Sequence, residues 1–235
     1  MATQAQKQEF IQKMWQAILN NRHRLQGLFP SVIIVQSGFE SGWGQDLIAK
    51  NYHNYFGFKV GKTEPVYSDR WCDANGKRFF ATQTPEYKNG KKVYITDKFR
   101  VYDNMEDSLV DRNALIFSLD RYKAALSAKT PLEQLQALQK GEYSTSPTYA
   151  NDIWKQIQHD GLTKYDELLQ QALAEDAKKK SAKAQNKPNS TAKTGLEKKE
   201  RKLKGWHIGL IIVVSSLALV GGIGYLVWRN WNNEK

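Results

Sequence analysis

The stretch PSVIIVQSGFESGWGQDLIAKNYHNYFGFK, residues 30–59, decides the fold and the chemistry of this chain. Its apolar first third, opened by Pro30, predicts a helix that is buried on most sides. Gly42 and Gly44 should end that helix and leave space for a ligand. Glu40 therefore lies where an apolar helix meets a glycine-rich turn. Burial disfavours the charged form of a carboxyl group, so we expect Glu40 to keep its proton near neutral pH, as a general acid must. The alternative is a helix end whose glutamate points to water.

Four short motifs in this order resemble the bacterial glucosaminidases of glycoside hydrolase family 73, which include flagellar peptidoglycan hydrolases. They are QSGFESGWG (36–44) with NYFGFK (54–59), TPEY (84–87), KFRVY (98–102) with DS (107–108), and SPTYA (146–150) with IWK (153–155). The last motif has Ser146 where the family usually has aspartate, a change that is expected to loosen the loop carrying Tyr149 and puts activity, not fold, in doubt. The resemblance covers roughly residues 26–169 and implies hydrolysis of peptidoglycan.

Composition divides the 235 residues into a catalytic domain and an appendage. Residues 1–171 mix polar residues with frequent Trp, Tyr and Phe, enough for a sizeable core. Residues 172–205 soon become rich in Lys, Ala, Ser, Asn and Glu, a composition that buries too little apolar surface to fold alone. We expect a basic disordered linker there. An exposed helix is the alternative, although Pro188 and Gly195 argue against a single continuous one.

A membrane-spanning helix is predicted at residues 206–228, followed by a short tail at 229–235. Residues 208–227 carry no charge, a length that matches the bilayer core, and Trp206 and Trp228 flank them as interfacial aromatic residues do. We therefore expect a single-pass C-terminal anchor in the cell membrane.

The orientation of this anchor is left open by the sequence. Six basic residues precede the span within residues 193–204 and only Arg229 and Lys235 follow it, so the positive-inside rule would keep the domain in the cytoplasm. The first ten residues show no secretory signal. A wall hydrolase, however, has to face the wall. A phage-type lysis enzyme released at membrane failure, a non-standard export route and a structural role in a virion or secretion apparatus would each reconcile these observations.

The net charge of +11 is concentrated in the linker, which could bind anionic lipid or an anionic wall polymer, or could be a solvated spacer. Nucleic acid is not expected, because the basic run lacks the interleaved aromatic residues of single-strand binders. The lone Cys72 excludes an intrachain disulfide framework.

Within the domain, the patterns predict an α+β, mainly helical, lysozyme-like fold with one β-hairpin lobe. An amphipathic first helix has Phe10, Met14 and Ile18 on one face. Two β-branched and aromatic runs between residues 78 and 102, separated by Asn89-Gly90, predict the hairpin. Asp103 or Asn104 should cap the next helix, and Thr130-Pro131 should open a later helix that Gly141 closes. The same lysozyme-like arrangement is implied by the family resemblance.

Glycosidic cleavage usually needs two carboxyl groups beside an oxocarbenium-like transition state. Glu40 takes the acid role, and the resemblance implies Glu86 on the hairpin as the second group. If Glu86 activates water, the two groups should lie roughly 6.5 to 9.5 Å apart or more, as in inverting enzymes. If the N-acetyl group of the substrate is the nucleophile instead, Glu86 only orients it. The remaining acidic candidates are Glu64, Asp69 and Asp73.

Tyr149 is implied by the resemblance to face the acid across a cleft, where its hydroxyl could hold the acetamido group or polarise the attacking group. The aromatic rings predicted to form walls of the substrate cleft are Trp43, Tyr55, Phe56 and Trp154, although aromatic residues at helical spacing are more often plain core. Asn54 is predicted to donate a hydrogen bond to glycan. The four histidines show no metal-ligand spacing, and no phosphate loop is present, so no metal or cofactor is expected.

The sequence thus predicts an endo-β-N-acetylglucosaminidase that cleaves the β-1,4 bond after N-acetylglucosamine. Two alternatives stay open. A lytic transglycosylase would use Glu40 alone, and a catalytically silent module would only tie an envelope or phage assembly to the wall.

Overall fold

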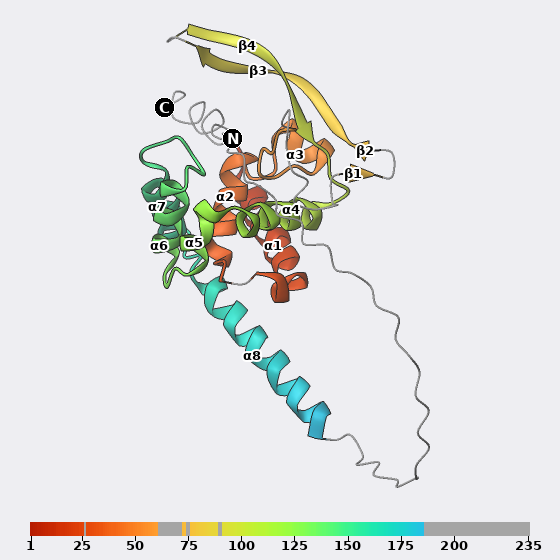
Figure 1. Ribbon diagram of the computed structural model, residues 1–235, viewed down its shortest axis with the longest axis vertical. Coiled ribbons are helices and arrows are strands. Elements are labelled where there is room, and N and C mark those ends of the chain that lie inside the picture. Colours follow the sequence, from red (N-terminus) through yellow and green to blue (C-terminus); the bar gives the residue numbers. More distant parts are fainter. Residues whose placement is uncertain (26, 61–71, 74–75, 89–90, 186–235) are drawn as a thin grey trace, which may run out of the picture.

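The helix that ends at Glu40 lies at the centre of the fold (Figure 1). The computed structural model describes residues 1–25, 27–60, 72–73, 76–88 and 91–185. Helix α2 (Pro30–Glu40) has Pro30 in its first turn, as predicted, and every residue from 30 to 38 is buried. It packs against α1 (Gln4–Asn20), α6 (Pro131–Lys140), α7 (Tyr149–His159) and α8 (Lys164–Gln185), which explains why most of its residues are apolar.

Helix α1 (Gln4–Asn20) covers one side of α2. A capping box fixes its start, in which the Thr3 hydroxyl accepts from the Gln6 backbone N–H and the Gln6 side chain accepts from Thr3 N–H. The predicted face of Phe10, Met14 and Ile18 is buried. A short 3₁₀ turn (Arg22–Arg24) follows, and helix α3 (Leu47–Tyr52) comes after α2.

The remaining helices follow the hairpin. They are α4 (Met105–Ser118), a 3₁₀ turn (Asp120–Tyr122), α5 (Lys123–Leu126), α6 (Pro131–Lys140) and α7 (Tyr149–His159). The predicted caps are confirmed. Asn104 accepts from the Asp107 N–H at 2.9 Å, Thr130 accepts from the Glu133 N–H at 3.2 Å, and Gly141 ends α6.

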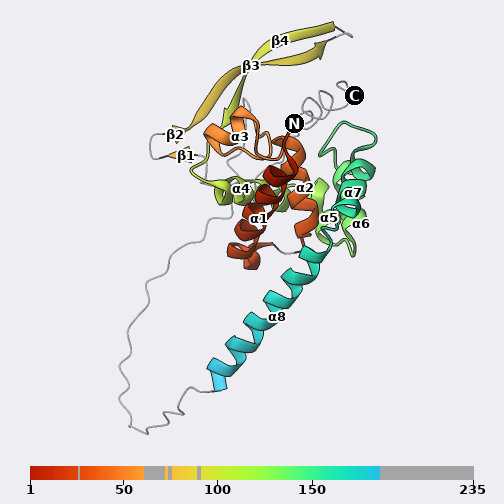
Figure 2. The same ribbon diagram turned by 180° about the vertical axis from the view of Figure 1, so that it is seen from behind.

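The predicted hairpin consists of β3 (Phe79–Lys88) and β4 (Lys91–Arg100), paired antiparallel from Phe79 with Arg100 to Lys88 with Lys91. The predicted turn residues 89 and 90 lie outside the described residues. A second two-stranded pair, β1 (Cys72–Asp73) with β2 (Gly76–Lys77), had no sequence signal. Figures 1 and 2 show the hairpin projecting at one end of the molecule and α8 at the other.

A buried polar cluster holds the base of the hairpin to α4. Asp111 accepts from Arg100 Nη1 at 2.6 Å and from the Tyr102 hydroxyl at 2.7 Å. Arg100 and Tyr102 are each 2% exposed, and Asp111 is fully buried. The carboxylate thereby satisfies two donors at once, which such a dry position requires.

Helix α8 (Lys164–Gln185) runs through residue 172, where the disordered linker was predicted to begin. The catalytic domain was expected to end at residue 171 and a disordered linker to begin at 172, but α8 continues as an exposed helix to Gln185. Asp176 supports it by accepting from Arg22 Nε at 2.6 Å and Nη2 at 3.2 Å. The Ala, Lys and Glu content favours the helix, as the alternative interpretation of this stretch held. Residues 186–205 of the predicted linker lie outside the described residues.

The predicted membrane span at 206–228 and the tail at 229–235 also lie outside the described residues. Across the described parts of residues 1–185, none of the helices combines the length and the apolar character that crossing a membrane requires.

Candidate active site

Glu40 is the last residue of α2, and a tight turn follows it. Gly42 and Gly44 have φ values of +55° and +76°, which favour glycine, so they end the helix as predicted. Asp46 N–H then donates to the Ser41 carbonyl at 3.1 Å and closes the turn. Glu40 is thus presented by a rigid helix and a well-bonded turn rather than by a loop.

The carboxyl group of Glu40 is poorly solvated. The residue as a whole is partly exposed, but its Oε2 atom is buried, and among the described residues no group is hydrogen-bonded to that atom. Burial raises the pKa of Glu40 to about 8. The carbonyl end of α2 also carries partial negative charge, which disfavours a carboxylate further. The predicted protonated acid is therefore what the geometry supports.

Two tyrosines lie within electrostatic reach of Glu40. Tyr149 is the first residue of α7, and Tyr143 packs on it with ring centroids 6.0 Å apart. Burial raises the pKa of Tyr143 to about 12 and that of Tyr149 well above its ordinary value, and the charge of Glu40 contributes to both shifts. The position of Tyr149 across a cleft from the acid, which the resemblance implied, stays a prediction. Tyr143 was not predicted from the sequence, because nothing distinguishes it there from the other tyrosines.

A buried hydrogen-bond network lies beneath Tyr149 and was also missed. Gln36, one helical turn before Glu40, donates through Nε2 to the Tyr149 hydroxyl, and Gln36 Oε1 accepts from Arg112 Nη2. Arg112 is fully buried in α4, and its Nη1 donates to Asn113 Oδ1 at 2.9 Å. A buried polar residue needs a partner, so Gln36 inside an apolar helix was a signal for this network. No sequence signal pointed to Arg112.

Trp43 and Phe56, predicted as walls of the substrate cleft, are core residues instead, at 4% and 2% exposed. Trp43 contacts the edge of Phe10 with ring centroids 5.9 Å apart, and its ring covers Gly38 so closely that a Cβ there would lie 2.5 Å away. Aromatic spacing alone could not distinguish core from wall.

Asn54, predicted to donate to glycan, is 2% exposed and has no amide hydrogen left for a ligand. Its Nδ2 donates to the backbone carbonyls of Phe58 and Arg100 at 2.8 and 3.0 Å, and its Oδ1 accepts from the Phe58 N–H at 3.0 Å. Asn54 therefore ties the segment after α3 to the end of β4 and is a structural residue.

Tyr55 and Trp154 are partly buried, so a contact with substrate stays a prediction for both. The Tyr55 hydroxyl lies 3.5 Å from His53 Nδ1, and its ring lies against Phe10. Glu86 is described through its backbone, which pairs with Val93 in the hairpin, so its separation from Glu40 also stays a prediction. Glu64 and Asp69 lie outside the described residues, and Asp73 is in β1.

The loop that carries Tyr149 is well fixed despite Ser146. Ser146 is buried, and its hydroxyl accepts from the Thr148 N–H at 3.4 Å. Gln139 of α6 holds the loop from outside, since its Nε2 donates to the Pro147 carbonyl and its Oε1 accepts from the Ala150 N–H, at 2.9 and 2.8 Å. The two hydrogen bonds of Gln139 thus oppose the loosening that was expected from serine at position 146.

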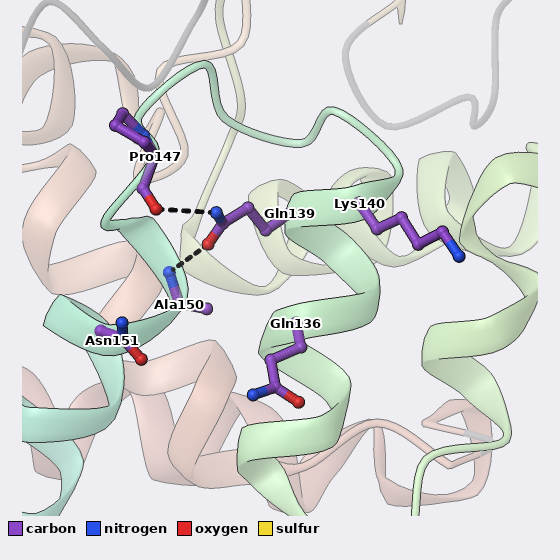
Figure 3. A pocket seen from close by; sticks show the side chains of 6 residues that line it. All are labelled: Gln136, Gln139, Lys140, Pro147, Ala150 and Asn151. Carbon is purple, nitrogen blue, oxygen red and sulfur yellow. Dashed lines mark hydrogen bonds between the residues drawn. The ribbon is translucent and has the colours of Figure 1, made fainter.

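Figure 3 shows the hydrogen bonds of Gln139 to Pro147 and Ala150, in a surface pocket between α6 and α7. The pocket has a volume of about 360 Å³, and its lining residues are Gln136, Gln139, Lys140, Pro147, Ala150 and Asn151. Neither Glu40 nor Tyr149 lines it. Among the described residues, no group of three or more His, Cys, Asp or Glu side chains is placed to hold a metal ion.

Comparison with known proteins identifies the family of this chain. The sequence model of the glucosaminidase family, described as mannosyl-glycoprotein endo-beta-N-acetylglucosaminidase, matches residues 16–162. Peptidoglycan hydrolase FlgJ of Pseudomonas aeruginosa is 32% identical over 154 residues, which cover 63% of this chain and 36% of that protein. Exo-glucosaminidase LytG of Bacillus subtilis is 31% identical over 147 residues, which cover 60% and 47%. The chain thus spans less than half the length of these curated relatives.

Two solved structures share the fold at 27% identity. The catalytic domain of the autolysin Auto from Listeria monocytogenes superposes with a TM-score of 0.57, covering 71% of this chain and 90% of that one. A C-terminally truncated glycoside hydrolase domain of Salmonella typhimurium FlgJ gives a TM-score of 0.50, covering 65% and 96%. The resemblance inferred from the four motifs is confirmed, and the chain belongs to the glucosaminidase family of glycoside hydrolases.

Proposed function

We propose that this protein hydrolyses peptidoglycan at the β-1,4 bond after N-acetylglucosamine, with Glu40 as the general acid. The observation that carries the proposal is the buried, unpartnered Oε2 of Glu40 at the end of a rigid helix. The names of the curated relatives, peptidoglycan hydrolase and exo-glucosaminidase, support this substrate and this bond.

The chemistry follows from the protonation state of Glu40. A pKa of about 8 keeps the carboxyl group protonated at neutral pH, so it can donate to the glycosidic oxygen as the bond to the anomeric carbon breaks. The developing positive charge on the sugar then favours the ionised carboxylate that remains. The same group can later accept a proton from the incoming nucleophile.

Tyr149 and Glu86 complete the proposed site. The Tyr149 hydroxyl lies close enough to Glu40 for the charge of Glu40 to raise the pKa of Tyr149, which supports a contact with the substrate beside the scissile bond. Glu86, on the projecting hairpin, is proposed either to activate water or to orient the N-acetyl group.

The test compares the purified full chain with Glu40→Gln on isolated peptidoglycan, with mass spectrometry of the reduced muropeptides. Removing a general acid typically costs about 10²- to 10⁴-fold in rate. The wild type should release fragments ending in reducing N-acetylglucosamine, and Glu40→Gln should not. Glu9→Gln is the matched control, because Glu9 is exposed and pairs with Lys13 on α1.

Other products would identify a different activity. Anhydro-muramyl ends would indicate a lytic transglycosylase, and reducing N-acetylmuramic acid would indicate a muramidase, the activity named for a 30% identical Lactococcus lactis relative. If neither protein cleaves but both bind the wall equally, the chain is a wall-binding module and the proposal is wrong.

We further propose that residues 206–228 anchor the protein in the cell membrane and that the domain faces the wall. The uncharged stretch at 208–227 and the flanking tryptophans support the anchor. The basic residues at 193–204 are proposed to contact anionic lipid or an anionic wall polymer.

A further inference from the structure

Three helices meet at Gln36, and the direction of every hydrogen bond there is determined by one residue. Arg112 of α4 bonds to Gln36 of α2, which bonds to Tyr149 of α7. Gln36 and Arg112 are 1% and 0% exposed, so water cannot substitute for a missing partner of either side chain, whereas Tyr149 keeps 6% of its surface exposed. Phe56 lies beneath the guanidinium, 5.9 Å from its centre. No salt bridge joins Arg112 to a carboxylate in the part of the chain that the structure describes.

The polarity follows from the chemistry of the guanidinium group. Arginine has five N–H donors and no acceptor, so the Gln36 atom that faces Arg112 must be the carbonyl oxygen. The Gln36 NH₂ group then has to face Tyr149 and can only donate to it. The Tyr149 oxygen is therefore the acceptor in this bond, and its own hydrogen is left for another partner. Within the described residues, the Tyr149 hydroxyl makes no other hydrogen bond.

We propose that Arg112 and Gln36 are positioning residues that set Tyr149 as a hydrogen-bond donor toward the substrate beside Glu40. This inference rests on the proposed function for its catalytic meaning. A donor at that place can hold a substrate oxygen, such as the acetamido carbonyl, in the orientation that the reaction needs. A tyrosine that donated to its own protein instead would leave that oxygen unbound.

Gln36→Glu tests the direction without changing the shape of the side chain. A carboxylate at this position has only acceptors, so it would accept from both Arg112 and the Tyr149 hydroxyl and draw the tyrosine hydrogen away from the site. Its charge would pair with the buried Arg112, so the folded state should not be weakened. We expect kcat to fall about 100-fold, as when one preorganised donor is lost, with little change in KM and an unchanged or higher Tm.

The double variant separates positioning from a general loss of order. Tyr149→Phe removes the same donor directly, so Gln36→Glu combined with Tyr149→Phe should be no less active than either single variant. The matched control is Gln12→Glu. Gln12 Nε2 donates to the Tyr165 hydroxyl at 3.2 Å in the same manner, between α1 and α8 and with no residue of the site. This variant should keep wild-type activity.

The result that overturns the proposal is a Gln36→Glu protein that keeps more than half of the wild-type kcat, or one whose kcat and Tm fall together. The latter would make Gln36 merely a packing residue. If the losses of kcat in Gln36→Glu and Tyr149→Phe add fully in the double variant, the two substitutions do not act through the same hydrogen bond and the proposal is wrong.

A second measurement does not depend on catalysis. In ¹⁵N–¹H spectra of the full chain, the Gln36 side-chain amide should shift when Tyr149 is replaced by Phe, because its acceptor is removed. An unchanged Gln36 amide would overturn the proposal even if the protein cleaves peptidoglycan. If the wild type cleaves nothing but the amide shifts, the proposed function fails and the assigned hydrogen-bond direction stands.

Discussion

Glu40 joins the stability of the fold to its chemistry. Its ordinary pKa is 4.5, and burial raises the pKa in the folded chain to about 8. Between these two values the folded chain holds a proton that the unfolded chain releases. The free energy of unfolding should therefore fall as pH rises through this window.

Glu40→Gln should remove this loss of stability, because glutamine has no proton to release. Each pKa unit corresponds to about 1.4 kcal/mol, so the variant should exceed the wild type by up to about 4 kcal/mol at pH 7.5. At pH 4 the two proteins should be nearly equal. Urea unfolding at both pH values measures this difference, with Glu9→Gln as the exposed control. A gain of the same size at both pH values would show that ionisation of Glu40 is not its cause.

At the scale of single residues, local sequence motifs predicted some candidate site residues, whereas residues whose role depends on tertiary packing were missed. Glu40 was identified because an acid at the end of an apolar helix is rare, and Tyr149 because the resemblance supplied it. Asn54 and Trp43 carried the same signals as ligand-binding residues, but the fold uses one to bond backbone and the other to fill the core. Arg112 could not be predicted, because its partner lies 76 residues away in the chain.

The hairpin is the element whose attachment matters most to the proposed site, since it carries Glu86. Its base is fixed by Asp111, which accepts from Arg100 and Tyr102 in a dry environment. Losing the carboxylate charge would remove the ion pair that Asp111 makes with the buried Arg100 guanidinium.

We expect Asp111→Asn to destabilise the protein by roughly 3 to 5 kcal/mol, the usual cost of breaking a buried ion pair. Amide hydrogen exchange should increase first along β4, where the attachment is lost. Asp103→Asn is the contrasting variant. Its partner Arg78 lies 2.5 Å away, but Asp103 is largely exposed, so the loss of stability should be much smaller than that caused by Asp111→Asn. Equal effects of the two substitutions would contradict this difference in burial.

Element boundaries were predictable where a local signal marks them. Pro30, Asn104, Thr130 and Gly141 each act through the backbone of their own helix, and all four appear where expected. The continuation of α8 past residue 171 had no such signal. Its sequence reads equally as linker or exposed helix, and the contact between Arg22 and Asp176 that supports it is distant in the chain.

At the scale of the whole molecule, we expect membrane binding to depend on the predicted anchor and not on residues 1–185. Full-length protein should sediment with neutral vesicles, whereas a chain ending at residue 185 should stay in the supernatant. The reason is the uncharged stretch at 208–227, which buries about 20 residues in a bilayer core.

A third chain ending at residue 205 retains the basic run without the span. It should bind vesicles that contain anionic lipid and release them at high salt, because screening weakens surface attraction. If this chain sediments with neutral vesicles as strongly as the full-length protein does, residues 206–228 are not the anchor.

The contact between Gly38 and Trp43 limits how this family domain can vary. A Cβ at position 38 would meet the indole ring at 2.5 Å, and the two residues bracket Glu40 on either side. A library randomised at both positions should therefore keep alanine at 38 only together with a small side chain at 43. The acid is thus held by a pair of positions that must change together, which makes single-site engineering of this turn a poor route to altered activity.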